Sequence, residues 1–358
     1  MKIVIFGLTI SSSWGNGHAT LWRGLVRALI AQGAELVFFE RDASYYAPHR
    51  DLHEIPGGEL HIYSDWNSVR PLAERHLREA DVGVVTSYCA DALAAGEAVL
   101  SAPRPLAVFY DLDSPVTLGR LKRGEAVDYV GSRGYSDYDL VLSYAGGPAL
   151  DALKQITGAR RTAPLYGHVD PQAYSPAAPA PHYRGDLSYI GSYAADRQAS
   201  LDALFLEPAR RAPRRRFVLA GAQYPADFAW TDNVYFVRHL PPAEHPAFYA
   251  SSRATLNVTR RDMAQMGYAP SGRLFEAAAC GACLISDEWP GLADFFSPGE
   301  EILLARDAAD TLAALELSDI ELQRIGRAAR ARALSDHTSA RRAAEFLEHV
   351  GAARARAA

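Results

Sequence analysis

The amino-acid sequence predicts an α/β protein made of two Rossmann-like domains, each built on a parallel sheet, with a helical C-terminal segment. The chain has 358 residues, which is more than one hydrophobic core usually accommodates, so two domains are expected. Apolar runs of strand length alternate with segments whose apolar residues recur at helical spacing. This alternation starts twice, on either side of a proline-rich stretch. The two starts favour two units of similar architecture.

The first domain is expected at residues 1–168. Strands are predicted where the apolar runs lie, at 2–8, 35–40, 81–88, 104–111 and 139–145. Strands that are apolar on both faces are typical of a parallel sheet covered by helices. After the first strand, HATLWRGLVRALIAQG ends at Gly33 and carries an apolar stripe at Leu21, Leu25, Ala28 and Leu29, which predicts the first crossover helix.

A linker is expected at residues 169–185, because proline interrupts both helices and central strands. The second domain is then expected at residues 186–337. Its strands are predicted at 186–193, 215–222, 233–239, 254–259 and 283–287. Residues 338–358 form the predicted C-terminal helix and tail.

Composition excludes several classes of function. The formal net charge is −5, whereas nucleic-acid-binding domains usually carry a basic stripe, so no nucleic-acid partner is expected. No apolar run approaches the length of a membrane helix, and MKIVIFGL is too short for a signal peptide, so we expect a cytoplasmic protein without membrane insertion. Cys280 and Cys283 form a single CxxC pair, which cannot by itself close a zinc site.

The stretch SSSWGNGH follows the first predicted strand and opens the first predicted helix. Such a turn presents backbone N–H groups and the positive end of the helix dipole, so Gly15 and Gly17 are candidates to approach a phosphate. A dinucleotide fingerprint would need a third glycine where Thr20 stands, although Glu40 ends the second strand where an acid would bind a ribose. His18, at the exit of the loop, is a candidate general base.

Two further carboxylates follow the buried strand RPLAVFYD. In open α/β sheets, ligands bind at the carboxyl ends of the strands, which is where Asp111 and Asp113 are placed. Asp113 precedes Ser114-Pro115 and could alternatively cap the next helix. Asp111 could orient His18, so that the carboxylate fixes the tautomer and the imidazole takes a proton.

Several motifs across both halves resemble one known family. They are FYDLDSPVTL at 109–118, LYGHVDPQAYSP at 165–176, LSYIGSYAADRQ at 187–198 and APSGRLFEA at 269–277. The last of these motifs is followed by Cys280 and Gly281. Through these motifs the chain resembles the GT-B glycosyltransferases, and more narrowly their CgeB-type branch, the spore-maturation-protein-like enzymes. The resemblance implies GT-B architecture, in which the parallel sheets of two Rossmann-like domains face a central cleft.

The resemblance and the chemistry of the residues point to the same donor site. Charge accumulates on the diphosphate leaving group, and helix N-termini and arginine suit that charge. Ser271 and Gly272 are predicted at a helix start, with Arg273 in its first turn. The resemblance implies that Glu276 binds the ribose hydroxyls of the nucleotide.

A second anion site is predicted in the turn after strand 186–193. Gly191 provides the turn, and Arg197 is its charged member. Arg260, at the end of ATLNVTRR, is a third candidate for phosphate. One position departs from the family pattern, because retaining enzymes commonly carry a second glutamate where Tyr268 stands. Inversion and retention therefore both remain open.

The sequence thus predicts a glycosyltransferase that moves a sugar from a UDP-, dTDP- or GDP-sugar to a small-molecule, glycan or protein acceptor. No cofactor and no metal are expected, even though Asp111-Leu112-Asp113 has the letters of a DxD motif. Three alternatives stay open at this point. They are a nucleotide-sugar epimerase or hydrolase on the same fold, an NAD-dependent dehydrogenase, and a non-catalytic nucleotide-binding protein.

Overall fold

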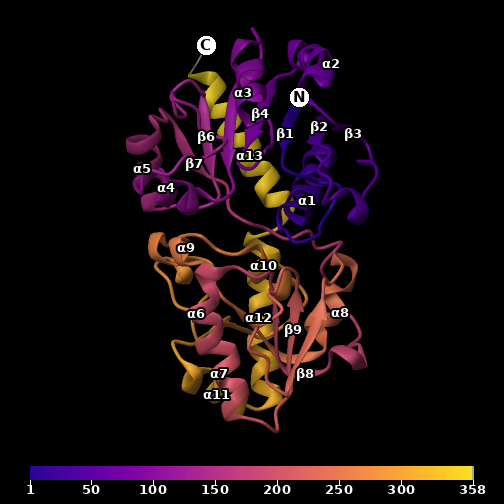
Figure 1. The fold of residues 1–358 in the computed structure, drawn as a ribbon, viewed down its shortest axis with the longest axis vertical. Coiled ribbons are helices and arrows are strands. Elements are labelled where there is room, and N and C mark those ends of the chain that lie inside the picture. The colour runs from indigo at the N-terminus through magenta and orange to yellow at the C-terminus, as the bar shows by residue number, and fades with distance from the viewer. Residues whose placement is uncertain (357–358) are drawn as a thin grey trace. The chain divides into compact units, whose positions relative to one another are not determined.

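The computed structural model describes residues 1–356, which form two compact units. The first unit comprises Met1–Ser13, Gly17–Tyr166 and the segment from Ser339 onward, and the second comprises Trp14–Asn16 and Gly167–Thr338. Figure 1 traces both units along the chain. The predicted α/β class with two parallel sheets is confirmed.

The first unit is a seven-stranded parallel sheet in the order β3-β2-β1-β4-β5-β6-β7. Its strands are β1 (Lys2–Gly7), β2 (Glu35–Arg41), β3 (Glu59–Tyr63), β4 (Val82–Thr86), β5 (Leu106–Asp111), β6 (Leu140–Ser143) and β7 (Thr162–Pro164). Its helices are α1 (His18–Ala31), α2 (Trp66–Glu79), α3 (Ala92–Ser101), α4 (Ser114–Lys122), α5 (Pro148–Thr157) and α13 (Ser339–Ala355). The chain order reverses between β1 and β4, so the loops after these strands flank the point where open α/β sheets bind ligands.

The second unit is a six-stranded parallel sheet in the order β10-β9-β8-β11-β12-β13. Its strands are β8 (Gly185–Ile190), β9 (Phe217–Gly221), β10 (Val234–Arg238), β11 (Ser252–Asn257), β12 (Leu284–Ser286) and β13 (Leu303–Leu304). Its helices are α6 (Gln198–Leu201), α7 (Glu207–Arg211), α8 (His245–Ala250), α9 (Arg261–Met266), α10 (Gly272–Ala279), α11 (Ala308–Glu316) and α12 (Asp319–Asp336). Here the order reverses between β8 and β11, and the loops after those strands carry Arg197 and Arg260.

Several inner strands of the two sheets are buried along their whole length. Every residue of β4, β5 and β9 is buried, as expected for strands with helices on both faces. The edge strands β3 and β10 are partly exposed and contain charged or aromatic residues. The C-terminal helix α13 returns to the first unit, where it contacts α1 and β5 (Figure 1).

A π-helical turn at Asp202–Leu206 joins α6 to α7. Proline has no N–H, so Pro208 cannot donate to the carbonyl of Leu204 four residues earlier. Thr311 Oγ1 donates to that carbonyl instead, at 3.2 Å. The irregular turn therefore has a local cause in the sequence.

Candidate active site

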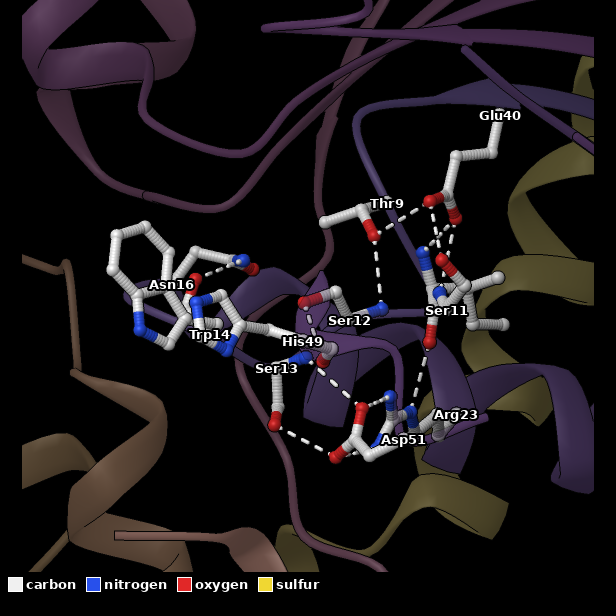
Figure 2. A network of polar contacts seen from close by, with 11 residues as sticks. Thr9, Ser11, Ser12, Ser13, Trp14, Asn16, Arg23, Glu40, His49 and Asp51 are labelled. Atoms are coloured by element: carbon white, nitrogen blue, oxygen red, sulfur yellow. Dashed lines mark hydrogen bonds and ion pairs between the residues drawn. The ribbon is translucent and has the colours of Figure 1, made fainter. Parts of the chain in front are cut away.

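The loop after β1 is held in place by the buried carboxylate of Glu40, the predicted ribose ligand of a dehydrogenase. One carboxylate oxygen accepts from Ile10 N at 2.8 Å and Ser11 N at 2.9 Å, and the other from the hydroxyls of Thr9 and Ser11 at 2.9 and 2.5 Å (Figure 2). Glu40 has no exposed surface, and both of its oxygens are used inside the protein. Glu40 is therefore engaged inside the protein, and the dehydrogenase interpretation has no acidic residue at this position to bind a ribose.

A second carboxylate, Asp51, holds the next part of the same loop. Asp51 accepts from Ser13 N at 3.2 Å and Ser13 Oγ at 2.8 Å, and it forms a two-pronged ion pair with Arg23, at 2.6 and 3.1 Å. Arg23 also donates to the carbonyl of Ile10 (Figure 2). Together with Ser12 N, which donates to Thr9 Oγ1, the amides of residues 10–13 all have partners in the chain. A phosphate bound at this loop could therefore contact only the residues after Ser13.

Those last residues include the two glycines and the histidine that the sequence singles out. Gly15 has a φ of +68°, a conformation that favours glycine. Gly17 is the N-cap of α1, and His18 is the first residue of that helix. The half-buried ring of His18 meets the ring of Tyr88 edge-on, with 5.7 Å between centroids. Tyr88 has a φ of +63° in the loop after β4, so a strained residue stands beside the predicted base.

Asp111 ends β5 and is completely buried. Its carboxylate accepts from Asp113 N and Thr117 Oγ1, both at 3.1 Å, and from the hydroxyl of Tyr135 at 3.4 Å. Burial raises the pKa of Asp111 to about 7, although these hydrogen bonds oppose the rise. Asp111 is therefore a buried carboxyl group with its own set of partners.

A chain of contacts connects Asp111 with His18, and the direct His18–Asp111 pair stays a prediction. Thr117, which bonds Asp111, also shares a 2.8 Å hydrogen bond with Tyr129. The ring of Tyr129 meets that of Tyr88 at 5.1 Å, and Tyr88 in turn meets His18. Three side chains, Thr117, Tyr129 and Tyr88, thus connect the buried Asp111 with His18.

Asp113 occupies the N-cap position of α4, as the capping alternative required, but its side chain makes no capping hydrogen bond. It is half-buried, so its carboxylate is more accessible than that of Asp111.

In the second unit, α10 begins where the sequence places the diphosphate site. Ser271 is its N-cap, and its hydroxyl accepts from Arg273 N at 3.3 Å. Gly272 is the first residue of the helix. Within residues 1–356 the half-buried Arg273 guanidinium has no hydrogen bond and no ion pair to any other side chain. An unpaired cation beside a helix N-terminus is suited to bind an anion.

The loops after β8 and β11 contain the other arginine candidates, both already paired. Arg197 donates to the carbonyl of Ser192 within its own loop. Arg260 forms a 2.8 Å ion pair with Asp196, which joins the two loops on either side of the sheet's reversal point. Gly191 is packed so tightly that a side chain would meet the hydroxyl of Tyr189 at 2.5 Å. This glycine serves close packing of the turn.

Glu276, one turn into α10, lies in a buried polar cluster. The hydroxyl of Tyr174 bonds the Glu276 carboxylate and lies 3.2 Å from His245 Nδ1, while His245 Nε2 contacts the carbonyl of Leu240 at 3.2 Å. Burial lowers the pKa of His245, with the nearby Arg273 contributing, so the ring is neutral at pH 7. Only about a tenth of the Glu276 side chain is exposed. Its carboxylate is therefore held in one orientation.

Sequence reasoning missed the residues that fix these groups. Tyr174 lies in the proline-rich segment and His245 opens a short helix, and neither stands near Glu276 in the sequence. Asp287, which follows β12, accepts from Thr259 N and Thr259 Oγ1 at 3.0 and 2.9 Å and so anchors the loop that carries Arg260. Burial raises the pKa of Asp287 to about 6. Its position at the carboxyl end of a predicted strand was the available signal.

Two other features that the sequence analysis considered are Tyr268 and the CxxC pair. Tyr268, which replaces the second glutamate, has a φ of +49°, and its N–H donates to the carbonyl of Pro290 at 2.8 Å. Cys280 and Cys283 are buried free thiols, and burial raises the pKa of each to about 12. Neither cysteine belongs to a metal-ligand group among residues 1–356.

Known proteins resemble this chain in its second half and in its fold. Residues 197–348 match the family described as glycosyl transferase-like. Sucrose-phosphate synthase from Thermosynechococcus elongatus has a similar fold, with a TM-score of 0.70 at 15% identity over 97% of both chains. HepE from Anabaena in complex with UDP and glucose has a TM-score of 0.69 at 14% identity, over 98% of this chain and 100% of that one.

The catalytic domain of starch synthase IV from Arabidopsis thaliana, bound to ADP and acarbose, has a TM-score of 0.67 at 11% identity. That match covers 98% of this chain and 99% of the synthase domain. No curated protein matches the chain in sequence. The whole chain therefore has the fold of these GT-B proteins, and residues 197–348 match a glycosyl transferase-like family. Among residues 1–356, no helix combines the length and the apolar character needed to span a bilayer.

Proposed function

We propose that the protein transfers a sugar from a nucleotide-diphosphate sugar to an acceptor hydroxyl, with the diphosphate bound at the N-terminus of α10. The observation that carries this proposal is the Arg273 guanidinium, which is half-buried and has no partner of its own within residues 1–356. Ser271 and Gly272 place the first amides of α10 beside it. Helix dipole and guanidinium together supply the positive charge that a leaving diphosphate needs, so no metal is required for that task.

Glu276 binds the ribose in this proposal, as the resemblance to GT-B enzymes implies. The buried cluster with Tyr174 and His245 supports the assignment, because it holds the carboxylate before the ligand arrives. Arg197 and Arg260 brace the neighbouring loops through Ser192 and Asp196 and supply further positive charge there. The solved complexes of HepE with UDP-glucose make UDP-sugars the first donors to test.

In the transfer step, the acceptor oxygen bonds to the anomeric carbon as the bond from that carbon to the diphosphate oxygen breaks. The diphosphate leaves with the electron pair, and the acceptor proton goes to a base. We assign that base to His18, which stands at the carboxyl edge of the first sheet and is only half-buried. Asp111 is fully buried and cannot touch an acceptor, so its role is to position the tyrosines beside His18. Asp113 is the alternative base.

The narrower resemblance to the CgeB-type branch remains part of this proposal. It is supported by the motifs at 109–118, 165–176, 187–198 and 269–277. The proposed acceptor is a small molecule, a glycan or a protein.

The proposal is tested by steady-state kinetics with the nucleotide sugar whose diphosphate gives the largest thermal shift among UDP, GDP, dTDP and CDP. Arg273→Ala should raise the donor KM by tenfold to 100-fold, since one charge-assisted hydrogen bond contributes roughly 1.5–3 kcal/mol. Arg273→Lys should recover part of this loss, because lysine keeps the charge but not the planar geometry. The exposed Arg261, on α9 in the same unit, supplies the matched control Arg261→Ala. An unchanged KM in Arg273→Ala would refute the donor site.

A further inference from the structure

Three metal-binding side chains converge on the face of the first sheet that α2 covers. Glu59 and His61 are two residues apart on the edge strand β3, so both point to the same face. His76 comes from α2, which packs against β3. None of the three belongs to the donor site or lies beside His18 in sequence.

The separations of the donor atoms suit a tetrahedral metal site. His61 Nε2 lies 3.1 Å from Glu59 Oε2, and His76 Nε2 lies 3.8 Å from the same oxygen. One ligand atom from each of the three residues lies within 4.8 Å of the other two. Zinc bonds of about 2.0–2.1 Å in tetrahedral geometry place neighbouring ligands about 3.4 Å apart. The three atoms need only small movements to reach that spacing.

The surrounding packing holds both imidazoles in place. The ring of Phe39, fully buried on β2, lies 5.0 Å from the ring of His61 and 5.9 Å from that of His76. The two imidazole centroids are 5.4 Å apart. A site whose ligands are already oriented loses little side-chain entropy when an ion binds.

His76 supplies an independent observation that points to a ligand. This residue is only 7% exposed, yet within residues 1–356 neither ring nitrogen makes a hydrogen bond. Nδ1 is buried without a partner, and Nε2 faces Glu59 from beyond hydrogen-bonding distance. A buried polar group without a partner is rare in native proteins, and a bound ion is one of its ordinary explanations. An ion between Nε2 and Glu59 would give Nε2 a ligand, while Nδ1 stays buried without a partner among residues 1–356.

We propose that Glu59, His61 and His76 bind one divalent transition-metal ion, with Zn²⁺ as the expected ion and water in the fourth position. Two imidazoles and one carboxylate form a donor set that zinc accepts. The ion ties the edge strand β3 to α2 and stabilises the first unit. It takes no part in holding the diphosphate, so sugar transfer should survive removal of this metal.

The test uses the full-length protein without a polyhistidine tag, stripped of metal by a chelator. Zinc binding is measured by calorimetric titration, and cobalt substitution reports geometry through its visible absorption band. His61→Ala and Glu59→Gln alter partly exposed residues, so both variants should fold, which circular dichroism verifies. His53→Ala is the matched control, because His53 is an exposed histidine of the same unit outside the cluster.

The wild-type protein should bind one zinc ion per chain with micromolar affinity or better, and zinc should raise its Tm. His61→Ala and Glu59→Gln should each weaken binding by tenfold or more, while His53→Ala should bind like the wild type. Cobalt should give the intense visible band of a tetrahedral site. Absence of saturable zinc binding, or equal affinity in wild type and His61→Ala, would overturn the proposal.

Discussion

Replacing Asp111 with asparagine should stabilise the protein at alkaline pH and have less effect at acidic pH. Asparagine fits the site, because its Oδ1 can accept from Asp113 N and Thr117 Oγ1 as the carboxylate does. Its amide nitrogen can donate to the hydroxyl of Tyr135, which now donates to the carboxylate. The substitution therefore removes the buried charge while keeping the hydrogen bonds.

The magnitude follows from the pKa of Asp111. Burial raises that pKa from 3.8 to about 7. Between these values the unfolded chain has lost the proton while the folded protein retains it, so the wild type loses stability as pH rises. At about 1.36 kcal/mol per pH unit, the full loss is on the order of 4 kcal/mol, and about 3 kcal/mol of it falls between pH 5 and pH 8. The loss is complete roughly one pH unit above the pKa of the folded protein.

Urea-induced unfolding at pH 5 and pH 8 measures this effect. The stability of Asp111→Asn relative to the wild type should rise by about 3 kcal/mol between the two pH values. Asp51→Asn is the control. Burial acts to raise the pKa of Asp51, but Arg23 and Ser13 hold that pKa below its ordinary value. Asp51 is ionised in both the folded and unfolded states from pH 5 upward, so its variant should show a constant loss. A pH-independent difference for Asp111→Asn would refute the reasoning.

Three further predictions concern the loops and the buried clusters. Glu40→Gln places an amide group opposite N–H donors of the loop after β1, so it should cost about 2 kcal/mol of stability. The variant should not bind NAD, and thermal unfolding with and without NAD measures both effects. A variant as stable as the wild type would contradict the role of Glu40. Tyr174→Phe should raise the donor KM about tenfold with little change in kcat, and a purely structural role would instead lower Tm at unchanged KM. His18→Ala should lower kcat by 100-fold or more at saturating donor while leaving nucleotide affinity intact, and unchanged turnover would move the base to Asp113.

The strands of both sheets were predictable where they are buried on both faces. The runs ending at Gly7 and Asp111 are continuously apolar, and such runs have few alternatives to a central parallel strand. The edge strand β3 was not predicted. It contains Glu59 and His61 and is partly exposed, so its sequence shows neither a continuous apolar run nor a clean alternation. The chemistry that makes this strand a metal-site candidate is what conceals it as a strand.

The candidate site was predictable in its local parts and not in its long-range contacts. The start of α10 was readable because an N-cap serine, a glycine and the arginine that follows are neighbours in the chain. The partners of Glu276 lie far from it in sequence, at Tyr174 and His245. The contacts of the Asp111 side chain depend on α4 and on Tyr135, so sequence alone could not show which groups bond its carboxylate.

The location of the bound diphosphate tests the central claim most directly. A crystal structure with the nucleoside diphosphate that gives the largest thermal shift should show the pyrophosphate at the N-terminus of α10, within hydrogen-bonding distance of Arg273 and of the first amides of the helix. Pyrophosphate bound elsewhere, with Arg273 making no contact to it, would contradict the account.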